Sequence, residues 1–271
     1  MQMVYVRRTV ILLYSLIIVA PLYFVIVTVF KSTQEFYASP LGWPAAPSFR
    51  NVQALFAGQP IWRYFWNSAQ VTAGTVLLVL LLGSLISFAI VRFASRAGAV
   101  LFALFAAGLI VPSQVNMLTI YTLVQKLYLS DRLLGLILIS TALLLPLTVF
   151  MLTGFMKLLS REMIEAGSLE GCGEWGLYWR IAIPLAAPSL ATAATFLLVM
   201  VWNDLLIPML LLNGKSNLTL PLAMLQFRGE YVTNYPLLLT GVAVTALPLV
   251  LLFLFLQRYF VAGLTEGALK G

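Results

Sequence analysis

EAGSLEGCGEWGLYWRIAIPLAAP, residues 165–188, is the most polar and glycine-rich stretch of an otherwise apolar chain. Four of the nine acidic residues lie in it or just before it: Glu162, Glu165, Glu170 and Glu174. Gly167 and Gly171 are spaced so that in a helix they share one face, where a partner can approach closely. The order of residues predicts a short helix on a membrane surface, a break at Pro184 and Pro188, and then a new membrane span.

Two nucleotide-binding patterns occur here only in part. Gly171, Gly173 and Gly176 match the G-x-G-x-x-G fingerprint, but that fingerprint needs a buried strand before it, and an acid-rich helix is expected there instead. Residues 214–216, Gly-Lys-Ser, resemble the end of a phosphate loop, yet Met209 stands where its first glycine belongs. We therefore expect no nucleotide site in this chain. Any process in which the chain takes part and that requires energy must draw it from a partner or an ion gradient.

The composition is that of a membrane protein with several spans. Hydrophobic residues make up 62% of the 271, charged residues only 9%, and the mean hydropathy is +1.00, whereas soluble domains carry about 25% charged residues. There is no histidine and one cysteine, Cys172. This excludes internal disulfides, Cys/His zinc sites and histidine-dependent catalysis, so we expect no catalytic residue and no metal site, and Cys172 is expected to be a small packing residue.

Charge-free apolar runs predict six membrane-spanning helices. Each run exceeds the roughly 20 residues that a helix needs to cross a bilayer, and none alternates as barrel strands do. The runs are residues 9–30, 64–91, 97–125, 133–156, 181–203 and 231–257. The first run lacks an obvious small-residue cleavage site, so we expect a retained helix rather than a signal peptide.

Basic residues beside the spans predict the orientation. Arg7 and Arg8 precede the first span, and Arg92 and Arg96 fill the loop after the second, in both places without an acid. Such loops are typically cytoplasmic, so both termini and the loop that contains Glu165 are expected on the cytoplasmic side. The net charge of +7 is explained in this way and does not indicate a nucleic-acid partner.

Two features outside the spans leave alternatives open. Residues 31–63 contain four prolines and two tryptophans, which fits either a loop folded back at headgroup level, with aromatic side chains at the interface, or an unstructured connector. Asp204 either faces a cavity in the bundle, as a charge in a membrane usually does, or ends the apolar core at the outer surface. Gln114, Asn116 and Asn203 are further candidates for lining a pathway.

The opening stretch resembles the cytoplasmic "EAA" loop of ABC importer permeases. The matching positions are Glu165, Ala166, Gly171, Ile181 and Pro184, with Gly167, Cys172 and Ile183 as mild departures. The resemblance implies that a short helix, with Glu165 at its start, docks into a groove of an ATPase subunit, and that all the matching positions and Gly167 serve this coupling. An amphipathic interfacial helix without a partner is the alternative.

Most of the chain is similar to one branch of that family, the maltose-type sugar permeases. The further segments that carry the similarity are Asn67-Ser68, Trp202-Asn203, Pro208, residues 219–221, 257–263 and 267–271. The resemblance implies an all-α, polytopic type I ABC importer permease fold with a single transmembrane domain, residues 1–271. Its parts would be a cytoplasmic coupling loop at about 157–185, an outer loop at about 213–235 and a cytoplasmic tail at about 258–271.

The resemblance also implies partners. They are a second permease subunit, two ATPase subunits that bind ATP and Mg, an extracytoplasmic sugar-binding protein and a carbohydrate, at a bacterial cytoplasmic membrane. The outer loop would reach the binding protein, and Gly267 and Lys270 of the tail would contact the ATPases. The chain itself would be no enzyme and hold no cofactor. The alternative is a secondary transporter driven by an ion gradient, which needs titratable groups within the membrane, and only Asp204 hints at one.

Overall fold

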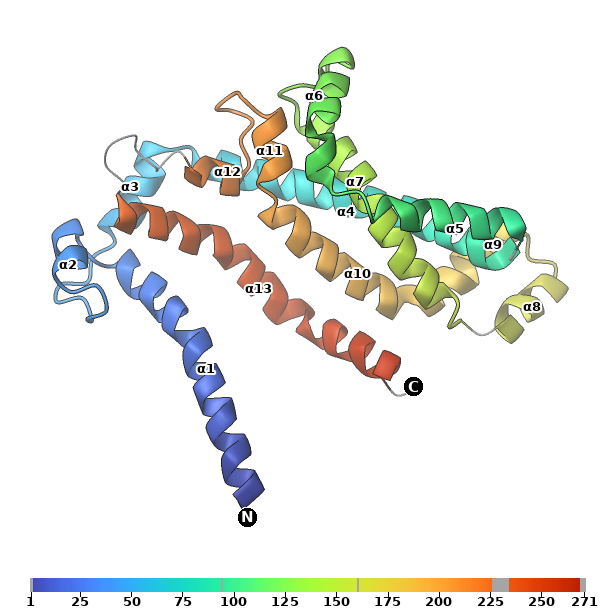
Figure 1. Ribbon diagram of the computed structural model, residues 1–271, viewed down its shortest axis with the longest axis horizontal. Helices are drawn as coiled ribbons and strands as arrows, with labels where there is room; N and C mark the ends of the chain where they lie inside the picture. The colour runs from blue at the N-terminus through green and yellow to red at the C-terminus, as the bar shows by residue number, and fades with distance from the viewer. Residues whose placement is uncertain (1, 94, 160, 226–233, 269–271) are drawn as a thin grey trace. The chain divides into compact units, whose positions relative to one another are not determined.

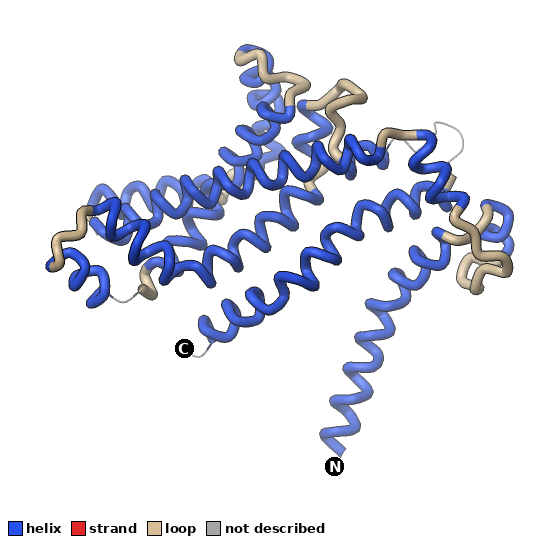
Figure 2. The backbone as a smooth tube through the Cα atoms, turned by 180° about the vertical axis from the view of Figure 1, so that it is seen from behind, coloured by secondary structure: helices blue, strands red, loops and turns tan. Residues whose placement is uncertain are grey.

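The computed structural model describes the backbone of residues 2–93, 95–159, 161–225 and 234–268. It describes the side chains of the same ranges except 2–4, 6, 113, 161 and 255–268. Within these ranges the chain consists of helices and connecting loops, and no strand is drawn (Figure 2). The expected all-α fold class is confirmed.

Five helices in the described part of the chain are long and apolar enough to cross a membrane. Four of them are α1 (Gln2–Val29), α4 (Ile61–Phe93), α7 (Leu133–Met156) and α13 (Tyr235–Ala268), and the fifth is α10 (Ile183–Asn203) together with the turns before it (Figure 1). The shorter helices are α2 (Thr33–Ala38), α3 (Arg50–Gly58), α5 (Arg96–Gly108), α6 (Met117–Lys126), α8 (Arg161–Leu169), α9 (Glu174–Leu177), α11 (Leu206–Leu211) and α12 (Leu220–Met224). A 3-10 turn, Ser113–Asn116, and a π-turn, Tyr178–Ala182, complete the set.

The third predicted span is not one continuous helix. It is divided into α5, the 3-10 turn and α6. Leu109 and Ile110 donate their N–H groups to the carbonyls of Ala106 and Ala107, which tightens the end of α5, and Pro112 then has no N–H to continue it. The six expected crossings are therefore five long helices and one divided segment.

Two compact units are formed, residues 1–65 with 220–250 and residues 66–219 with 251–271. In the first unit the segment between α1 and α4 is folded. The Lys31 ammonium is buried and donates to the carbonyls of Ser39 and Pro40 at 2.7 and 2.9 Å. The Asn51 amide donates to the carbonyls of Val29 and Lys31 at 2.9 and 2.8 Å. Of the two alternatives for this segment, the unstructured connector is wrong.

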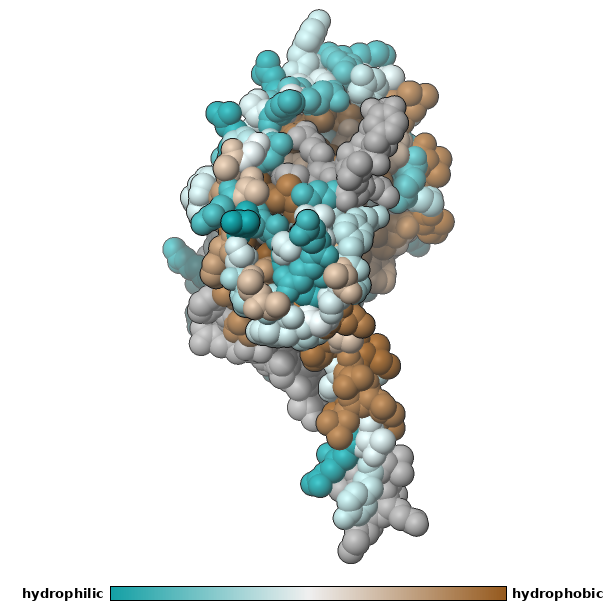
Figure 3. All heavy atoms as spheres, turned by 90° about the vertical axis from the view of Figure 1, so that its left-hand side faces the viewer, coloured by the Kyte–Doolittle hydropathy of each residue, from teal (hydrophilic) through white to brown (hydrophobic). Residues whose placement is uncertain are grey.

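Helix α1 of the first unit presents apolar side chains on every side. Leu12, Leu16 and Ile17 are each about 70% exposed, and the helix surface is brown over much of its length in Figure 3. A helix that is apolar all round requires lipid or another apolar surface about it, in agreement with a membrane span.

Small side chains let α4 and α7 approach closely in the second unit. A Cβ atom added at Gly83 would lie 2.7 Å from the Thr148 methyl carbon, which leaves no room for one. Close by, the Ser87 hydroxyl donates to the Val149 carbonyl at 3.2 Å and accepts from the Thr153 hydroxyl at 3.1 Å. Small residues and hydroxyl bonds of this kind hold helices together where lipid removes the hydrophobic driving force.

Contacts between loops show which loops of the second unit lie at the same end. At one end the Asp131 carboxylate accepts the N–H groups of Asn213 and Gly214 at 3.0 and 2.9 Å, which joins the loops after α6 and α11. At the other end Arg92, in the last turn of α4, contacts Ser168 of the segment after α7. Thus α5 and α6 together connect the two ends, as one crossing does.

Candidate functional site

The segment between α7 and α10 forms a surface helix that folds back on α4. Helix α8 begins at Arg161, so Glu162 lies in its first turn and Glu165 in the second. The expectation that Glu165 starts the helix is therefore wrong. Glu165 and Ala166 are exposed on α8.

A glycine in the left-handed conformation ends α8. Gly171 has φ +85°. Its N–H donates to the Ser168 carbonyl at 3.1 Å, and the Cys172 N–H donates to the Gly167 carbonyl at 3.0 Å. These two bonds are those of the Schellman motif, in which a glycine after the helix satisfies the last free carbonyls. Gly171 is thus a helix terminator that lets the chain reverse toward α9.

Gly167 faces inward, toward the returning part of the same segment. A Cβ atom added there would collide with the Ile181 Cδ1 atom and lie 3.0 Å from the Leu177 Cδ2 atom. The prediction that Gly167 and Gly171 share one helix face open to a partner is wrong, because α8 ends at Leu169 before the second glycine. Close packing of Gly167 is present, but its neighbour is the chain's own α9 and π-turn.

The prolines do not interrupt the helix that follows. Helix α9, the π-turn and α10 run on without a break from residue 174 to 203. The Ile183 N–H bonds the Tyr178 carbonyl in the wider π pattern, and Pro184, which has no N–H to donate, follows directly as the second residue of α10. The predicted break at Pro184 and Pro188 is therefore wrong; Ile181 lies in the π-turn, and Pro188 lies inside α10.

An apolar cluster fixes the segment to α4. Its buried members are Phe88, Leu177, Tyr178 and Ala182, with Cys172 packed at its edge. The rings of Phe88 and Tyr178 meet edge to face with centroids 5.4 Å apart, and the Tyr178 hydroxyl lies 2.7 Å from the Ser84 hydroxyl. The prediction of Cys172 as a small packing residue is confirmed.

An ion pair adds a polar attachment. The Arg92 guanidinium donates to both carboxylate oxygens of Glu174 at 3.1 Å and to the Ser168 hydroxyl at 3.3 Å. It thereby joins the end of α4 to both α8 and α9. Sequence reasoning used Arg92 only for orientation, and no local pattern pairs it with an acid 82 residues away.

The outer face of the segment is exposed and of mixed character. The acids Glu162, Glu165 and Glu170 are exposed on the segment, with Glu165 beside the cavity described below. Leu169 is 89% exposed and Trp175 67%. Large exposed apolar side chains rimmed by charge are typical of an interaction surface, and the acidic rim is complementary to a basic partner.

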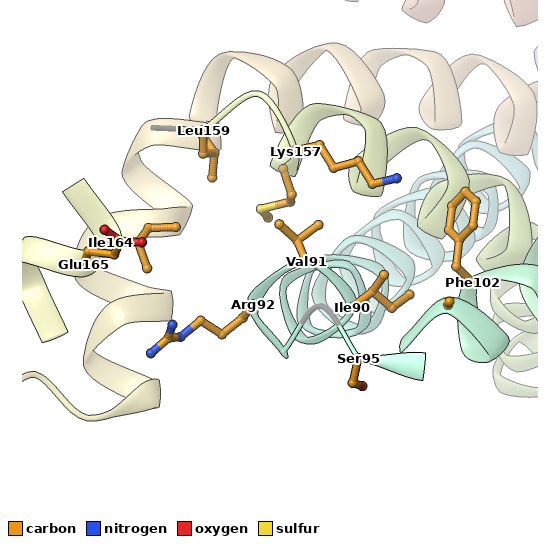
Figure 4. Close-up of a pocket in the computed structure, with 11 residues that line it drawn as sticks. Ile90, Val91, Arg92, Ser95, Phe102, Lys157, Leu159, Ile164 and Glu165 are labelled. Atoms are coloured by element: carbon orange, nitrogen blue, oxygen red, sulfur yellow. The ribbon is translucent and has the colours of Figure 1, made fainter. Parts of the chain in front are cut away.

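Behind α8 lies a cavity of about 610 Å³ between the ends of α4, α5 and α7. Figure 4 shows Lys157 reaching toward Phe102 and Arg92 directed toward the helix that carries Glu165. The Lys157 ammonium lies 5.2 Å from the centre of the Phe102 ring. The cavity separates part of α8 from the spans. Helix α8 contacts α4 through the bond from Arg92 to Ser168, and the Phe88–Tyr178 contact holds the π-turn that follows.

The four predicted pathway residues are not gathered in one place. Gln114 and Asn116 are exposed in the 3-10 turn. Asn203 is the exposed last residue of α10, and its side-chain amide donates to the carbonyl of Val199 at 2.9 Å. Only Asp204 lines a cavity, a small one between α4, α7 and α11.

Parts of the other predicted sites lie outside the described residues. The outer loop is described for 213–225 and 234–235, and residues 226–233 lie outside. Lys270 also lies outside the described residues. Gly267 lies in the last turn of α13, where side chains lie outside the described set.

Comparisons with known proteins agree in pointing to one family. The family described as "Binding-protein-dependent transport system inner membrane component" matches residues 79–266. The arabinooligosaccharides transport system permease protein AraQ of Halalkalibacterium halodurans is 34% identical over 78% of this chain and 75% of its own length. The melibiose/raffinose/stachyose import permease protein MelC of Bacillus subtilis is 32% identical over 93% of this chain and 91% of its own.

A solved structure has the same fold. It is the crystal structure of a bacterial ABC transporter involved in the import of the acidic polysaccharide alginate. One of its chains superposes with a TM-score of 0.84 at 16% identity, covering 94% of this chain and 95% of that one.

Proposed function

Because the chain belongs to the family of binding-protein-dependent transport system inner membrane components, we propose that it is the membrane subunit of an ATP-driven carbohydrate importer. It is a multi-pass membrane protein and a transport component, not an enzyme. The carbohydrate is supported by the names of AraQ and MelC, both of which specify oligosaccharides.

One observation carries the proposed mechanism: the segment formed by α8, α9 and the π-turn is held to α4 on its inner side and exposed on its outer side. The attachment consists of the Arg92–Glu174 pair and the Phe88–Tyr178 contact. The exposed side carries acids and Leu169. A partner that grips the outer face therefore moves the cytoplasmic end of α4 with it.

We propose that the partner that binds this outer face is an ATPase subunit. Glu165 and Ala166 are on the face that it would contact, while Gly167, Gly171, Ile181 and Pro184 shape the segment behind that face. ATP binding draws two ATPases together, the coupling segments follow, and the spans open the pathway outward. A shift of this kind requires the ligand to bind one state better than the other, and ATP and the loaded binding protein supply that difference.

The remaining partners follow the same proposal. A second permease completes the pathway, and an extracytoplasmic sugar-binding protein delivers the solute to the outer loop at about 213–235. Gly267 and Lys270 are proposed to contact the ATPases. Shortening the outer loop is expected to abolish uptake with a wild-type binding protein while the ATPases stay bound, and unchanged uptake would contradict the assignment.

The orientation and the pathway are also proposals. Both termini and the coupling loop, about 157–185, lie on the cytoplasmic side, which is supported by the contact of Arg92 with the segment after α7. Gln114, Asn116, Asn203 and Asp204 are proposed to line the pathway when it opens. The single transmembrane domain of residues 1–271 stays a prediction.

The deciding experiment reconstitutes the chain with its ATPases and second permease in vesicles that contain ATP. We expect labelled oligosaccharide to enter when the loaded binding protein is outside, and not when ATP is replaced by a non-hydrolysable analogue. A secondary transporter would instead import without ATPases when an ion gradient is imposed. Uptake driven by the gradient alone, with no co-purifying ATPase, would overturn the proposal.

A further inference from the structure

A small polar cavity lies in the second unit, among the helices α4, α7, α10 and α11. It is lined by the hydroxyl groups of Thr72 on α4, Ser140 on α7 and Thr219 before α12, and by Asp204 after α10. The exposed fractions of the three hydroxyl residues are 5%, 5% and 4%. Its other walls are Val71, Leu136, Val201, Trp202, Ser68 and Pro208.

The three hydroxyl oxygens have no hydrogen-bond partner within the described part of the chain. Five buried side-chain oxygens there share this property: those of Thr72, Thr75, Ser140, Thr141 and Thr219. Three of the five line this one cavity. Because a buried polar group without a partner is costly, most such groups in folded proteins bond to protein or to ordered water. A single ligand in the cavity accounts for all three.

The cavity has about 10 Å³ of room for the centre of a water molecule, which is close to the least that holds one water. We propose that one water molecule occupies it, bonded to the hydroxyls of Thr72, Ser140 and Thr219 and to the Asp204 carboxylate. Water donates two hydrogen bonds and accepts two, so four polar groups match its capacity. The carboxylate accepts backbone N–H groups of the turn, among them that of Leu206 at 3.1 Å, and a carboxylate has about four acceptor positions, which leaves capacity for one further donor.

This water joins α4, α7, the turn after α10 and the chain before α12. It therefore ties these elements of the second unit into one polar junction, on the end of the unit where Asp131 holds Asn213. A sodium ion would use the same oxygens and is the rival occupant.

Matched variants separate a filled cavity from an empty one. Thr72→Val and Ser140→Ala each remove a cavity hydroxyl with little change of shape. Thr75→Val and Thr141→Val are controls, because these hydroxyls are also buried and without a partner but do not line the cavity. In an empty cavity, all four changes remove an uncompensated polar group and raise or preserve the melting temperature.

If a water molecule is bound, Thr72→Val and Ser140→Ala each remove one of its hydrogen-bond partners. We expect the melting temperature of the detergent-solubilised protein to fall by about 2–4 °C for each, while the control variants show no fall. A result in which cavity and control variants behave alike would overturn the proposal.

Ion substitution distinguishes water from sodium. With water bound, replacing sodium chloride by choline chloride at constant ionic strength leaves the melting temperature of the wild-type protein unchanged. A rise in melting temperature that saturates with sodium and is lost in Thr72→Val identifies the occupant as sodium and overturns the assignment to water. Both measurements use the full chain and do not depend on transport.

Discussion

Arg92 at the end of α4 holds Glu174 at the start of α9 through two bonds, Nε to Oε2 and Nη2 to Oε1, each 3.1 Å long. The pair connects the segment between α7 and α10, which we propose to be the coupling segment, to a membrane span. It is only partly buried, with side-chain exposures of 28% and 47%. Pairs of this exposure contribute little to stability, about 0.2–1 kcal/mol. Removing the pair can therefore weaken the mechanical link between α9 and α4 while the stability of the fold changes little.

Arg92→Gln is expected to reduce transport more than stability. It removes the link to both Glu174 and Ser168, so motion of α8 reaches α4 less well, while the unfolding free energy changes by less than about 1 kcal/mol. The measurement is sugar uptake alongside thermal unfolding and the amount of co-purified ATPase. Arg96→Gln, which removes the same charge from the same loop, is the control and should transport normally.

A charge swap tests whether the pair itself matters. Arg92→Glu combined with Glu174→Arg restores an ion pair but not the bond to Ser168, so we expect uptake between those of the wild type and of Arg92→Glu alone. If the double variant is no better than the single one, the pair does not carry the coupling.

Gly171→Ala is expected to destabilise α8 by about 1–2 kcal/mol, because an L-residue is strained in the left-handed region. A Cβ atom there would meet no atom within 4 Å, so the effect comes from the backbone alone. Gly171→Leu should act in the same way. Loss of ATPase from the purified complex is the readout, together with the melting temperature.

The chain offers two controls for the Gly171 variants. Gly171→Asn should be milder than Gly171→Ala, since asparagine tolerates the left-handed region. Gly173→Ala should have a smaller effect, because Gly173 has φ −68° and equally open surroundings, and alanine is disfavoured there only by the N-cap position of α9. Equal effects of Gly171→Ala and Gly173→Ala would contradict the assigned role of the helix terminator.

Gly167→Ala is expected to force α8 away from the π-turn, because the new methyl group collides with the end of the Ile181 side chain. Overfilling of a packed site typically costs about 1–3 kcal/mol. Ile181→Val removes the Cδ1 atom that is struck, so the double variant should regain most of the lost stability and ATPase binding. Failure of this rescue would mean that Gly167 is required for another contact.

Asp131→Ala is expected to loosen the loop that begins at Asn213. It removes the acceptor of two backbone N–H groups and leaves alanine in a left-handed conformation, φ +52°. Asp131→Asn keeps an oxygen acceptor and tolerates that conformation, so it should be close to the wild type. We expect weaker stimulation by the binding protein for the alanine variant only, measured as uptake against binding-protein concentration.

Cysteine labelling tests the orientation. In a Cys172→Ser background, Lys215→Cys should react with a membrane-impermeant maleimide from outside intact cells, and Ala97→Cys should react only after the cells are opened. Both positions are exposed, so accessibility within the fold does not limit either reaction. The reverse pattern would place the coupling segment outside and exclude contact with a cytoplasmic ATPase.

The sequence by itself determined the membrane class, five of the six spans and the position of the polar segment between α7 and α10; that this segment couples to an ATPase stays a prediction. These depend on long apolar runs and on the few charged residues between them. Both are local properties of the sequence, and they decide directly which segments a bilayer can accommodate. The sixth span was predicted as one helix, and the glycine and proline near its middle, Gly108 and Pro112, were the local signal that it divides. Gly171 as a helix terminator was also within reach, since glycine is the usual residue after a helix.

Tertiary structure alone decided which side of the coupling segment faces the bundle. Gly167 turned out to face Ile181, and Arg92 to hold Glu174, because α4 and the returning chain lie against each other. The same holds for Thr72, Ser140 and Thr219, which lie far apart in the sequence and share one cavity. Such groupings depend on how the helices pack, and packing in lipid follows small residues and polar bonds between helices rather than any periodic pattern along one of them.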